Sequence, residues 1–430
     1  MNKKHSKILY LAHRIPYPPN KGDKIRTFNE IKYLSQDHGI DLVCLADNID
    51  DISFKKDLEL YCQQVFVLPL PTSLAKLQGI ISLILGKAIS VGYFYKRKLQ
   101  RIIDRLLKEN HYDAIICFSS PMAEYIYRSK FYNENKHRPI GQRTRLIMDF
   151  CDVDSDKWLQ YAQTAKFPMN LAYRIENKRL FEYEKQVSND FDFSVFTTNK
   201  EVDLFLAGHP VAKNLMSIPN GVDFQYFSPG AENPKENIQD KRFVIKDVHN
   251  KNNDIRDKGP ILLFTGSMDY YANVEGVSWF NAEILPLIKR KLPQAQFLIV
   301  GSNPHPIVKK LGENDGVIVT GFVDDIRPYY QMADICVIPL RLARGVQNKV
   351  LEAMSMGKPV VVTSKAVEGI MAVAGEHVFV QDTPDSFSEA VFRLFRDNSL
   401  KERMGMHARK FILDNYDWEC NIKKFNELLG

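Results

Sequence analysis

The fold is decided by one segment, residues 334–363, which reads DICVIPLRLARGVQNKVLEAMSMGKPVVVT. Residues 334–340 form an apolar run closed by a proline and a leucine, and residues 359–363 form a second apolar run entered through Gly357. Both are typical of short buried strands. Between them, residues 347–356 are good helix formers preceded by a glycine. Strand, turn, helix and strand predict one parallel crossover unit, whose helix offers unpaired N–H groups to an anion.

Positive charge is concentrated where this predicted helix begins. Arg341, Arg344 and Lys349 lie at its mouth, and Lys349 and Glu352 are three residues apart, so they share a helix face. A cation suits a phosphate, and a carboxylate suits the vicinal hydroxyls of a ribose. The segment therefore predicts a site for a nucleoside diphosphate. The alternative is a core helix with solvated charges at its start.

Similar apolar runs recur along the chain in two series. The first series is 8–12, 41–46, 65–68, 114–118, 146–150 and 193–197, and the second is 261–265, 296–300, 316–320, 335–339, 360–363 and 378–380. Helix-length segments separate these runs, which favours parallel crossovers over hairpins. We therefore expect an α/β protein of two doubly wound domains, 1–216 and 260–414. A linker at 217–229 and a polar insert at 230–259 join them.

Composition sets the class of protein. A chain of 430 residues with 45% hydrophobic residues can build two cores. The net charge of +6 is too diffuse to predict a nucleic-acid groove. Six cysteines without metal-binding spacing, and an N-terminus that runs directly into a strand, favour a reducing cytosol.

One apolar stretch adjoins a basic cluster. Residues 74–95 are too short and too often interrupted to span a bilayer, with Lys76 and Lys87 among the interruptions, and KRKLQR follows at 96–101. Such a stretch predicts peripheral contact with a membrane interface. The alternative is a pair of packed helices that line a cleft.

The helix at 347–356 resembles the nucleotide-sugar site of retaining glycosyltransferases of family 4, which have the GT-B fold. Those enzymes often carry two glutamates separated by seven residues. Glu352, followed by AMSMGKPVV, would be the second, and Arg344 stands in place of the first. The variant RGVQNKVLEAM is similar to the sugar transferases of exopolysaccharide and exosortase (PEP-CTERM) systems. The resemblance covers nearly the whole chain apart from the insert.

The resemblance implies two Rossmann-like domains that face each other across a cleft, with the C-terminal helix at 415–430 packed back on the first domain. It implies transfer of a sugar, with retention and without a metal or other cofactor, from a nucleotide-sugar donor to a glycan or lipid-linked acceptor. A cytoplasmic enzyme of exopolysaccharide biosynthesis, in peripheral contact with the inner membrane through 74–101, would follow. Two alternatives stay open, a GT-B nucleotide-sugar epimerase and a non-catalytic nucleotide-sugar-binding scaffold of a polysaccharide assembly complex.

The same resemblance assigns the site residues. The donor would be bound by Gly22, Gly266, Arg341, Gly345, Asn348, Lys349 and Glu352. Lys349 and Arg344 would also stabilise the leaving diphosphate. Gly266 follows the first strand of the second domain, where a glycine permits close approach to a phosphate. In residues 320–325, which resemble a nucleobase-binding loop, Asp324 and Asp325 are expected to cap a helix rather than to hold a metal.

On the first domain, the loop after the first strand reads HRIPYPPNKGDKIR at 13–26. Its prolines stiffen it, Gly22 lets the backbone approach a ligand, and Lys21, Lys24 and Arg26 are expected to supply positive charge.

A pair of aspartates, Asp152 and Asp154, follows the strand at 146–150. Either can orient or deprotonate an acceptor hydroxyl. The alternative is that Asp154 or Ser155 caps the next helix. The Asp-x-Asp spacing resembles the metal-binding pair of the other glycosyltransferase fold, but the GT-B resemblance implies no metal.

Overall fold

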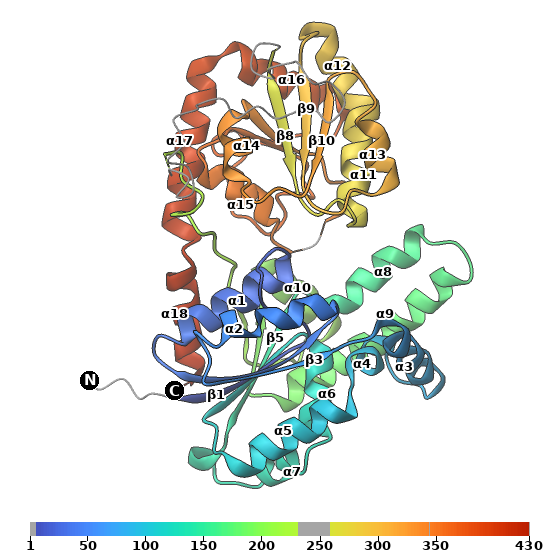
Figure 1. The fold of residues 1–430 in the computed structure, drawn as a ribbon, viewed down its shortest axis with the longest axis vertical. Coiled ribbons are helices and arrows are strands. Elements are labelled where there is room, and N and C mark those ends of the chain that lie inside the picture. The colour runs from blue at the N-terminus through green and yellow to red at the C-terminus, as the bar shows by residue number, and fades with distance from the viewer. Residues whose placement is uncertain (1–5, 231–258, 344, 430) are drawn as a thin grey trace. The chain divides into compact units, whose positions relative to one another are not determined.

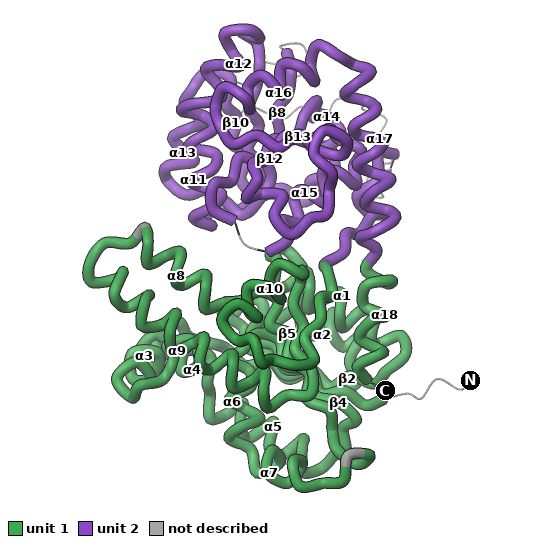
Figure 2. Tube along the Cα trace, turned by 180° about the vertical axis from the view of Figure 1, so that it is seen from behind, with its two compact units in different colours: residues 1–219, 418–430 green, residues 220–417 purple. Residues whose placement is uncertain are grey.

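The computed structural model describes residues 6–230, 259–343 and 345–429. The chain divides into two compact units, residues 1–219 with 418–430 (unit 1) and residues 220–417 (unit 2), as Figure 2 shows. Almost all of the predicted insert at 230–259, and the predicted site residue Arg344, lie outside the described residues.

Unit 1 is built on a seven-stranded parallel sheet in the order β3-β2-β1-β4-β5-β6-β7 (Figure 1). Its strands are β1 Lys7–Ala12, β2 Gly39–Ala46, β3 Gln64–Pro69, β4 Ala114–Phe118, β5 Arg145–Cys151, β6 Phe193–Phe196 and β7 Leu215–Ser217. Its helices are α1 Gly22–Leu34, α2 Lys55–Leu58, α3 Thr72–Ile84, α4 Ile89–Phe94, α5 Arg97–Glu109, α6 Ala123–Tyr127, α7 Lys130–Lys136, α8 Asp154–Thr164, α9 Met169–Asp190, α10 Asn199–Gly208 and α18 Trp418–Leu429.

Alternation along the strands divides the core of unit 1 into two layers. On β1, Ile8 and Tyr10 pack in a layer that includes Trp418 and Phe425 of α18. Leu9 and Leu11 pack in the other layer, with residues of α5. Successive strand residues point to opposite faces, so a sheet covered by helices on both faces needs continuous apolar strands. The C-terminal helix therefore completes the core of unit 1.

Unit 2 has a six-stranded parallel sheet in the order β10-β9-β8-β11-β12-β13. Its strands are β8 Ile261–Thr265, β9 Gln296–Val300, β10 Val317–Gly321, β11 Ile335–Ile338, β12 Val360–Val362 and β13 Phe379–Val380. Its helices are α11 Tyr271–Trp279, α12 Leu285–Lys291, α13 Pro306–Leu311, α14 Arg327–Met332, α15 Asn348–Ser355, α16 Pro384–Arg396 and α17 Asn398–Asn415. Both sheets change direction of strand order beside their first strand, which is the doubly wound pattern.

The predicted α/β class with two Rossmann-like domains is confirmed. Each predicted apolar run is a strand, and the helix predicted at 347–356 is α15. The sequence reading missed β7, a three-residue strand of half-buried residues that pairs with β6 at the edge of the sheet. Such a short strand carries no alternation from which it could be recognised.

A buried ion network ties α1 to β5 in unit 1. The Arg26 guanidinium donates to Asp149 Oδ2 from Nε at 2.9 Å and from Nη2 at 2.8 Å, and to the Ile218 carbonyl at 2.8 Å. Glu30 lies 2.9 Å from Arg26 Nε and accepts from the Tyr10 hydroxyl at 2.5 Å. Burial opposes the charge on Arg26, but Asp149 and Glu30 raise its pKa. The prediction that Arg26 serves a ligand is therefore wrong, because its donors are used inside the core.

Replacing Arg26 with methionine should destabilise unit 1 by about 3 to 5 kcal/mol, because it leaves a buried carboxylate uncompensated. Lys55→Met is the control, since the exposed Lys55–Glu59 pair should contribute less than about 1 kcal/mol. Denaturant titration read by hydrogen exchange separates the two units. Equal protection of the unit 1 amides from hydrogen exchange in both variants would contradict the proposed contribution of this network to the free energy of unfolding.

Candidate functional site

In unit 2 the strand order reverses between β8 and β11, so the loops that follow these two strands diverge at the carboxyl edge of the sheet. The loop after β8 begins at Gly266, with φ +150°. A Cβ placed on Gly301, after β9, would lie 1.7 Å from the Gly266 carbonyl oxygen. The two loops can approach this closely because residue 301 is a glycine.

Lys349 faces the loop after β8. It is the second residue of α15, and its ammonium donates to Asn273 Oδ1 at 2.5 Å. The ammonium lies 4.5 Å from the centroid of the Phe264 ring, and 3.1 Å from where a Cβ on Gly266 would be. Asn273, on α11, donates in turn to the Ser267 carbonyl at 2.8 Å. Loop, α11 and α15 thus converge on one cation.

The surroundings of Lys349 favour its neutral form. Burial lowers the pKa of Lys349 to about 7, and the Glu352 carboxylate opposes that shift. Glu352 accepts from the Tyr330 hydroxyl at 3.0 Å, and burial raises its pKa. The Tyr330 hydroxyl also lies 2.9 Å from Thr265 Oγ1 at the end of β8. The predicted cation and carboxylate do occupy neighbouring positions on α15. Tyr330 and Asn273 were missed as their partners, because no local pattern connects residues so far apart in the chain.

The other predicted donor residues have different surroundings. Gly345 adopts φ +59°, which requires glycine for an unstrained backbone, and Asn348 is the first residue of α15, with its Oδ1 3.5 Å from Asn220 Nδ2. Arg341 pairs with Glu275 of α11, with Nε 2.8 Å from Oε1, and lies 4.9 Å from the Trp279 ring centroid. Arg341 is thus charge-compensated. In the described part of the chain, Lys349 has no hydrogen bond to a carboxylate.

The Asp325 carboxylate accepts from the Arg327 backbone N–H at 2.9 Å and forms an ion pair of 2.6 Å with its guanidinium. It also accepts from the Tyr226 hydroxyl at 3.1 Å. Asp325 thus binds the first backbone N–H of α14, although Ile326 occupies the N-cap position of that helix. Among residues 6–230, 259–343 and 345–429, no cluster of three or more His, Cys, Asp or Glu side chains is placed to hold a metal ion.

In unit 1, Asp152 and Asp154 lie beyond the carboxyl end of β5. Asp152 Oδ1 accepts from the Thr197 hydroxyl at 2.9 Å, and Asp154 Oδ2 lies 3.4 Å from Ser119 Oγ. These partners follow β6 and β4, so three strand ends contribute to one polar cluster. Burial raises the pKa of Asp152, and the neighbouring Asp154 adds to that shift, while the Thr197 hydrogen bond opposes it.

Backbone strain accompanies this cluster. Cys151 at the end of β5 has φ +65°, and Ser119 after β4 has φ +71°. Residues other than glycine adopt this region at a cost of order 1–3 kcal/mol, and they concentrate at functional sites. The unfavourable backbone directs the chain so that Asp152 and Ser119 lie on neighbouring strand ends.

The alternative that Asp154 or Ser155 caps α8 is wrong. The Val153 N–H is bound by Glu201 at 2.7 Å, and the Ser155 N–H and hydroxyl are bound by Glu184 at 3.2 and 2.5 Å. Neither glutamate was foreseen, because both come from later helices. With the helix end satisfied, the carboxylates of Asp152 and Asp154 are available for another role.

The loop after β1 differs in part from its prediction. Gly22 is the first residue of α1, and a Cβ built on it would meet nothing within 4 Å. Lys24, however, is buried in a 2.7 Å ion pair with Asp51, so it offers no free charge to a ligand. Asp23 binds Arg14 at 2.7 Å and lies 3.3 Å from His13 Nε2. The rigid loop is present, but only Lys21 of its predicted cations is exposed.

The comparisons with known proteins cover part of unit 2 in one case and nearly the whole chain in another. Residues 259–397 match the family "Glycosyl transferases group 1". An uncharacterised 44.6 kDa protein in the cps region of Klebsiella pneumoniae is 23% identical over 431 residues, which is 96% of this chain and 97% of its own. A GDP-mannose-dependent α-(1-6)-phosphatidylinositol monomannoside mannosyltransferase of Mycolicibacterium smegmatis is 23% identical over 266 residues, 57% of this chain and 64% of its own.

Among solved structures, HepE of Anabaena in complex with UDP-glucose superimposes with a TM-score of 0.66 at 14% identity, over 99% of each chain. At this identity the likeness shows the fold alone. The two Rossmann-like units have the GT-B fold, unit 2 carries a glycosyltransferase group 1 domain at residues 259–397, and the chain is a glycosyltransferase enzyme.

Proposed function

We propose that this glycosyltransferase retains configuration at the anomeric carbon, needs no metal, and moves a sugar from a nucleotide-sugar donor to a glycan or lipid-linked acceptor. The observation that carries the proposal is the Lys349 ammonium. It is held by a neutral amide at 2.5 Å, beside the Gly266 loop where strand order reverses. An anion that enters this space meets a half-buried cation that is already oriented.

The diphosphate of the donor is the anion that fits this space. As the bond between the sugar and the β-phosphate breaks, negative charge builds on the leaving oxygen, and Lys349 with the N-terminus of α15 stabilises it. Glu352, held by Tyr330, would accept from the ribose hydroxyls. The acceptor oxygen attacks from the face that the phosphate leaves. Its proton passes to that phosphate or to a carboxylate of unit 1. HepE, which has the same fold, binds UDP-glucose.

In unit 1, we assign to Asp152 and Asp154 the role of orienting or deprotonating the acceptor hydroxyl. The raised pKa of Asp152 makes its carboxylate a stronger base than an ordinary aspartate, which suits a group that accepts the proton of the hydroxyl. Asp154 supplies a second negative charge beside it, which contributes to the raised pKa of Asp152.

The acceptor is proposed to be part of a surface polysaccharide, built at the cytoplasmic face of the inner membrane. The cps-region relative and a relative whose acceptor is a lipid-linked sugar support this direction. The RGVQNKVLEAM segment supports placement among family 4 enzymes of PEP-CTERM-associated exopolysaccharide systems. None of the helices described is long and apolar enough to cross a membrane. Residues 74–101 would provide peripheral contact instead.

Lys349→Ala should weaken binding of the matching nucleoside diphosphate by about tenfold to a hundredfold, the usual weight of a hydrogen bond to a charged group. Calorimetry with UDP, GDP and ADP, each with EDTA and with magnesium, identifies the base and tests metal independence. Lys365→Ala, an exposed lysine in unit 2 that pairs with Glu368 at 3.0 Å, is the control. Binding that requires magnesium, or that survives in Lys349→Ala, would refute the assigned site.

Nucleotide affinity should fall as the pH rises above 7. Only protonated Lys349 attracts the diphosphate. In the free protein its pKa is about 7, and a bound anion raises that pKa. Binding at pH 8 must therefore take up a proton, and the logarithm of affinity should fall by up to about one per pH unit. Calorimetry in buffers of different ionisation enthalpy counts the proton. The Lys349→Ala variant should show no such uptake.

Asp152→Asn should lower kcat for transfer by about a hundredfold or more while nucleotide binding stays unchanged, because a proton acceptor is lost without a change in shape. Asp154→Asn should have a smaller effect and should lower the apparent pKa of the pH–rate profile, since one neighbouring charge is removed. Release of nucleoside diphosphate in the presence of acceptor is the assay. Wild-type rates in both variants would remove these aspartates from the mechanism.

A further inference from the structure

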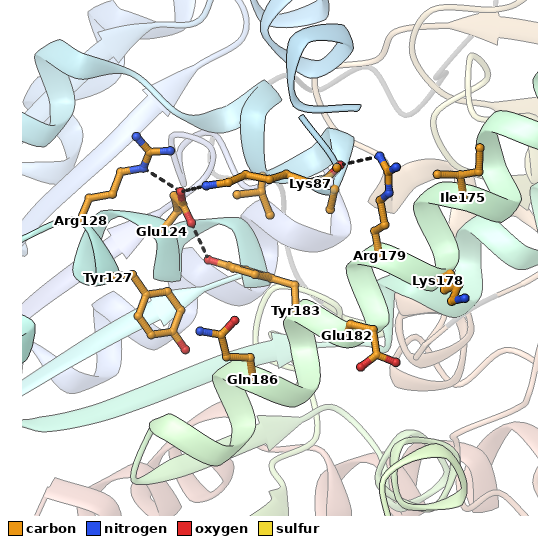
Figure 3. A pocket seen from close by; sticks show the side chains of 13 residues that line it. Lys87, Glu124, Tyr127, Arg128, Ile175, Lys178, Arg179, Glu182, Tyr183 and Gln186 are labelled. Atoms are coloured by element: carbon orange, nitrogen blue, oxygen red, sulfur yellow. Dashed lines mark hydrogen bonds and ion pairs between the residues drawn. The ribbon is translucent and has the colours of Figure 1, made fainter. Parts of the chain in front are cut away.

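A cavity of about 990 Å³ opens in unit 1. Its walls are the corner between α3 and α4, helix α6 and the middle of α9, and Figure 3 shows their side chains directed into it. The proposed chemistry uses none of these residues.

Cations outnumber carboxylates in this cavity. The lining includes four basic residues, Lys87, Arg128, Lys178 and Arg179, and two acidic residues, Glu124 and Glu182. The Lys87 ammonium and Arg128 Nε converge on the buried Glu124 carboxylate at 3.5 and 2.7 Å, as Figure 3 shows. One carboxylate cannot neutralise two cations, so the cavity has a net positive charge that favours an anionic group.

Hydrogen bonds from α9 hold the walls of the cavity in place. Arg179 Nη1 donates to the Leu83 carbonyl at 2.6 Å, which satisfies the end of α3. Glu176 accepts the backbone N–H groups of Ile89 and Ser90 at 2.5 and 2.9 Å, which caps α4. The corner that carries Lys87 is therefore held in place from both sides by α9.

Helix α3, which ends at this corner, buries small residues and exposes most of its large apolar ones. It packs on α4 through small residues, since a Cβ on Gly79 would lie 2.8 Å from Ile89 Cγ2, and its only buried residues are Ala75 and Gly79. Six of the seven large apolar residues of α3 and of its C-terminal turn are 46–78% exposed, and only Leu83 is half-buried. The six are Leu74, Leu77, Ile80, Ile81, Ile84 and Leu85. A contiguous patch of this kind marks a surface that another apolar body covers.

We propose that α3 inserts its exposed apolar face into a bilayer, and that the adjoining cavity takes the phosphate of an anionic lipid whose headgroup is a small phosphomonoester or diphosphate. The inference rests on the membrane contact in the proposed function and adds a binding site to it. The cavity would hold the lipid phosphate end of a membrane-bound acceptor while its sugar extends away.

Charge identifies a lipid as the occupant. From residue 60 to residue 103 the chain has no aspartate or glutamate, but it has six basic residues: Lys76, Lys87, Lys96, Arg97, Lys98 and Arg101. Anionic membrane surfaces attract such segments. A free phosphate would use the cations but leave the apolar face uncovered. A lipid with a phosphorylated headgroup satisfies both, because Lys87 lies only two residues beyond the exposed Ile84 and Leu85.

The test is co-sedimentation of the full chain with phosphatidylcholine vesicles that contain either phosphatidic acid or phosphatidylglycerol at equal surface charge. We expect tighter binding to the phosphomonoester lipid. Lys87→Ala/Lys178→Ala should weaken that binding about thirtyfold, because each cation near an anionic surface contributes about fivefold. Lys309→Ala/Lys310→Ala, two exposed lysines of α13 in unit 2, is the matched control and should bind as wild type.

Two further variants separate the headgroup site from the apolar face. Glu182→Gln removes a negative charge from the rim and should tighten binding a few-fold, which damage to the fold cannot do. Leu77→Glu/Ile81→Glu should abolish binding to all vesicles. Equal binding to both anionic lipids, or equal effects of the cavity and control variants, would overturn the headgroup site. Nucleotide calorimetry on the same proteins reports separately on the donor site, so failure of one proposal is distinct from failure of the other.

Discussion

Both units depend on one topological constraint, that parallel strands joined by right-handed crossovers present all their carboxyl ends at one edge. In unit 2 this constraint brings together residues that lie far apart in sequence. Asn273 follows β8, Lys349 follows β11, and the two meet at 2.5 Å because β8 and β11 are neighbours at the point where strand order reverses. In unit 1 the same edge collects Ser119, Asp152 and Thr197 from the ends of three adjacent strands.

Compensation distinguishes structural cations from those available to a ligand. Arg26 is fully buried, but two carboxylates and a carbonyl occupy its donors, and these partners keep it charged. Lys349 is half-buried, its described hydrogen bond is to a neutral amide, and burial lowers its pKa to about 7. A buried charge without a counter-ion is costly unless something else supplies the opposite charge. The difference between these two cations is the physical argument for an anionic ligand in unit 2 and against one at Arg26.

The sequence was sufficient where the signal is local. Apolar runs of strand length, separated by helix-length segments, predicted the two sheets, and the composition of 347–356 predicted α15 with Lys349 and Glu352 on one side. It failed where a partner comes from elsewhere in the chain. Lys24 and Arg26 look like free cations in a glycine loop until Asp51 and Asp149 are placed beside them. Likewise, an aspartate before a helix is typical of a cap, and only the fold shows that Glu184 and Glu201 bind the start of α8.

Helices α3 and α5 make the case for an external partner by their contrast. Both have 13 residues, and only α4 lies between them in the chain. Helix α5 buries Leu99, Ile103 and Leu106 against the sheet, the ordinary arrangement for an amphipathic helix. Helix α3 buries Ala75 and Gly79 and exposes all of its leucines and isoleucines except Leu83. Exposed apolar area costs about 25 cal/mol per Å² relative to burial, so a helix packed in this sense loses stability as an isolated chain. That loss would be offset if the apolar face lay in a bilayer, as proposed, and the small inward residues allow α3 and α4 to pack closely.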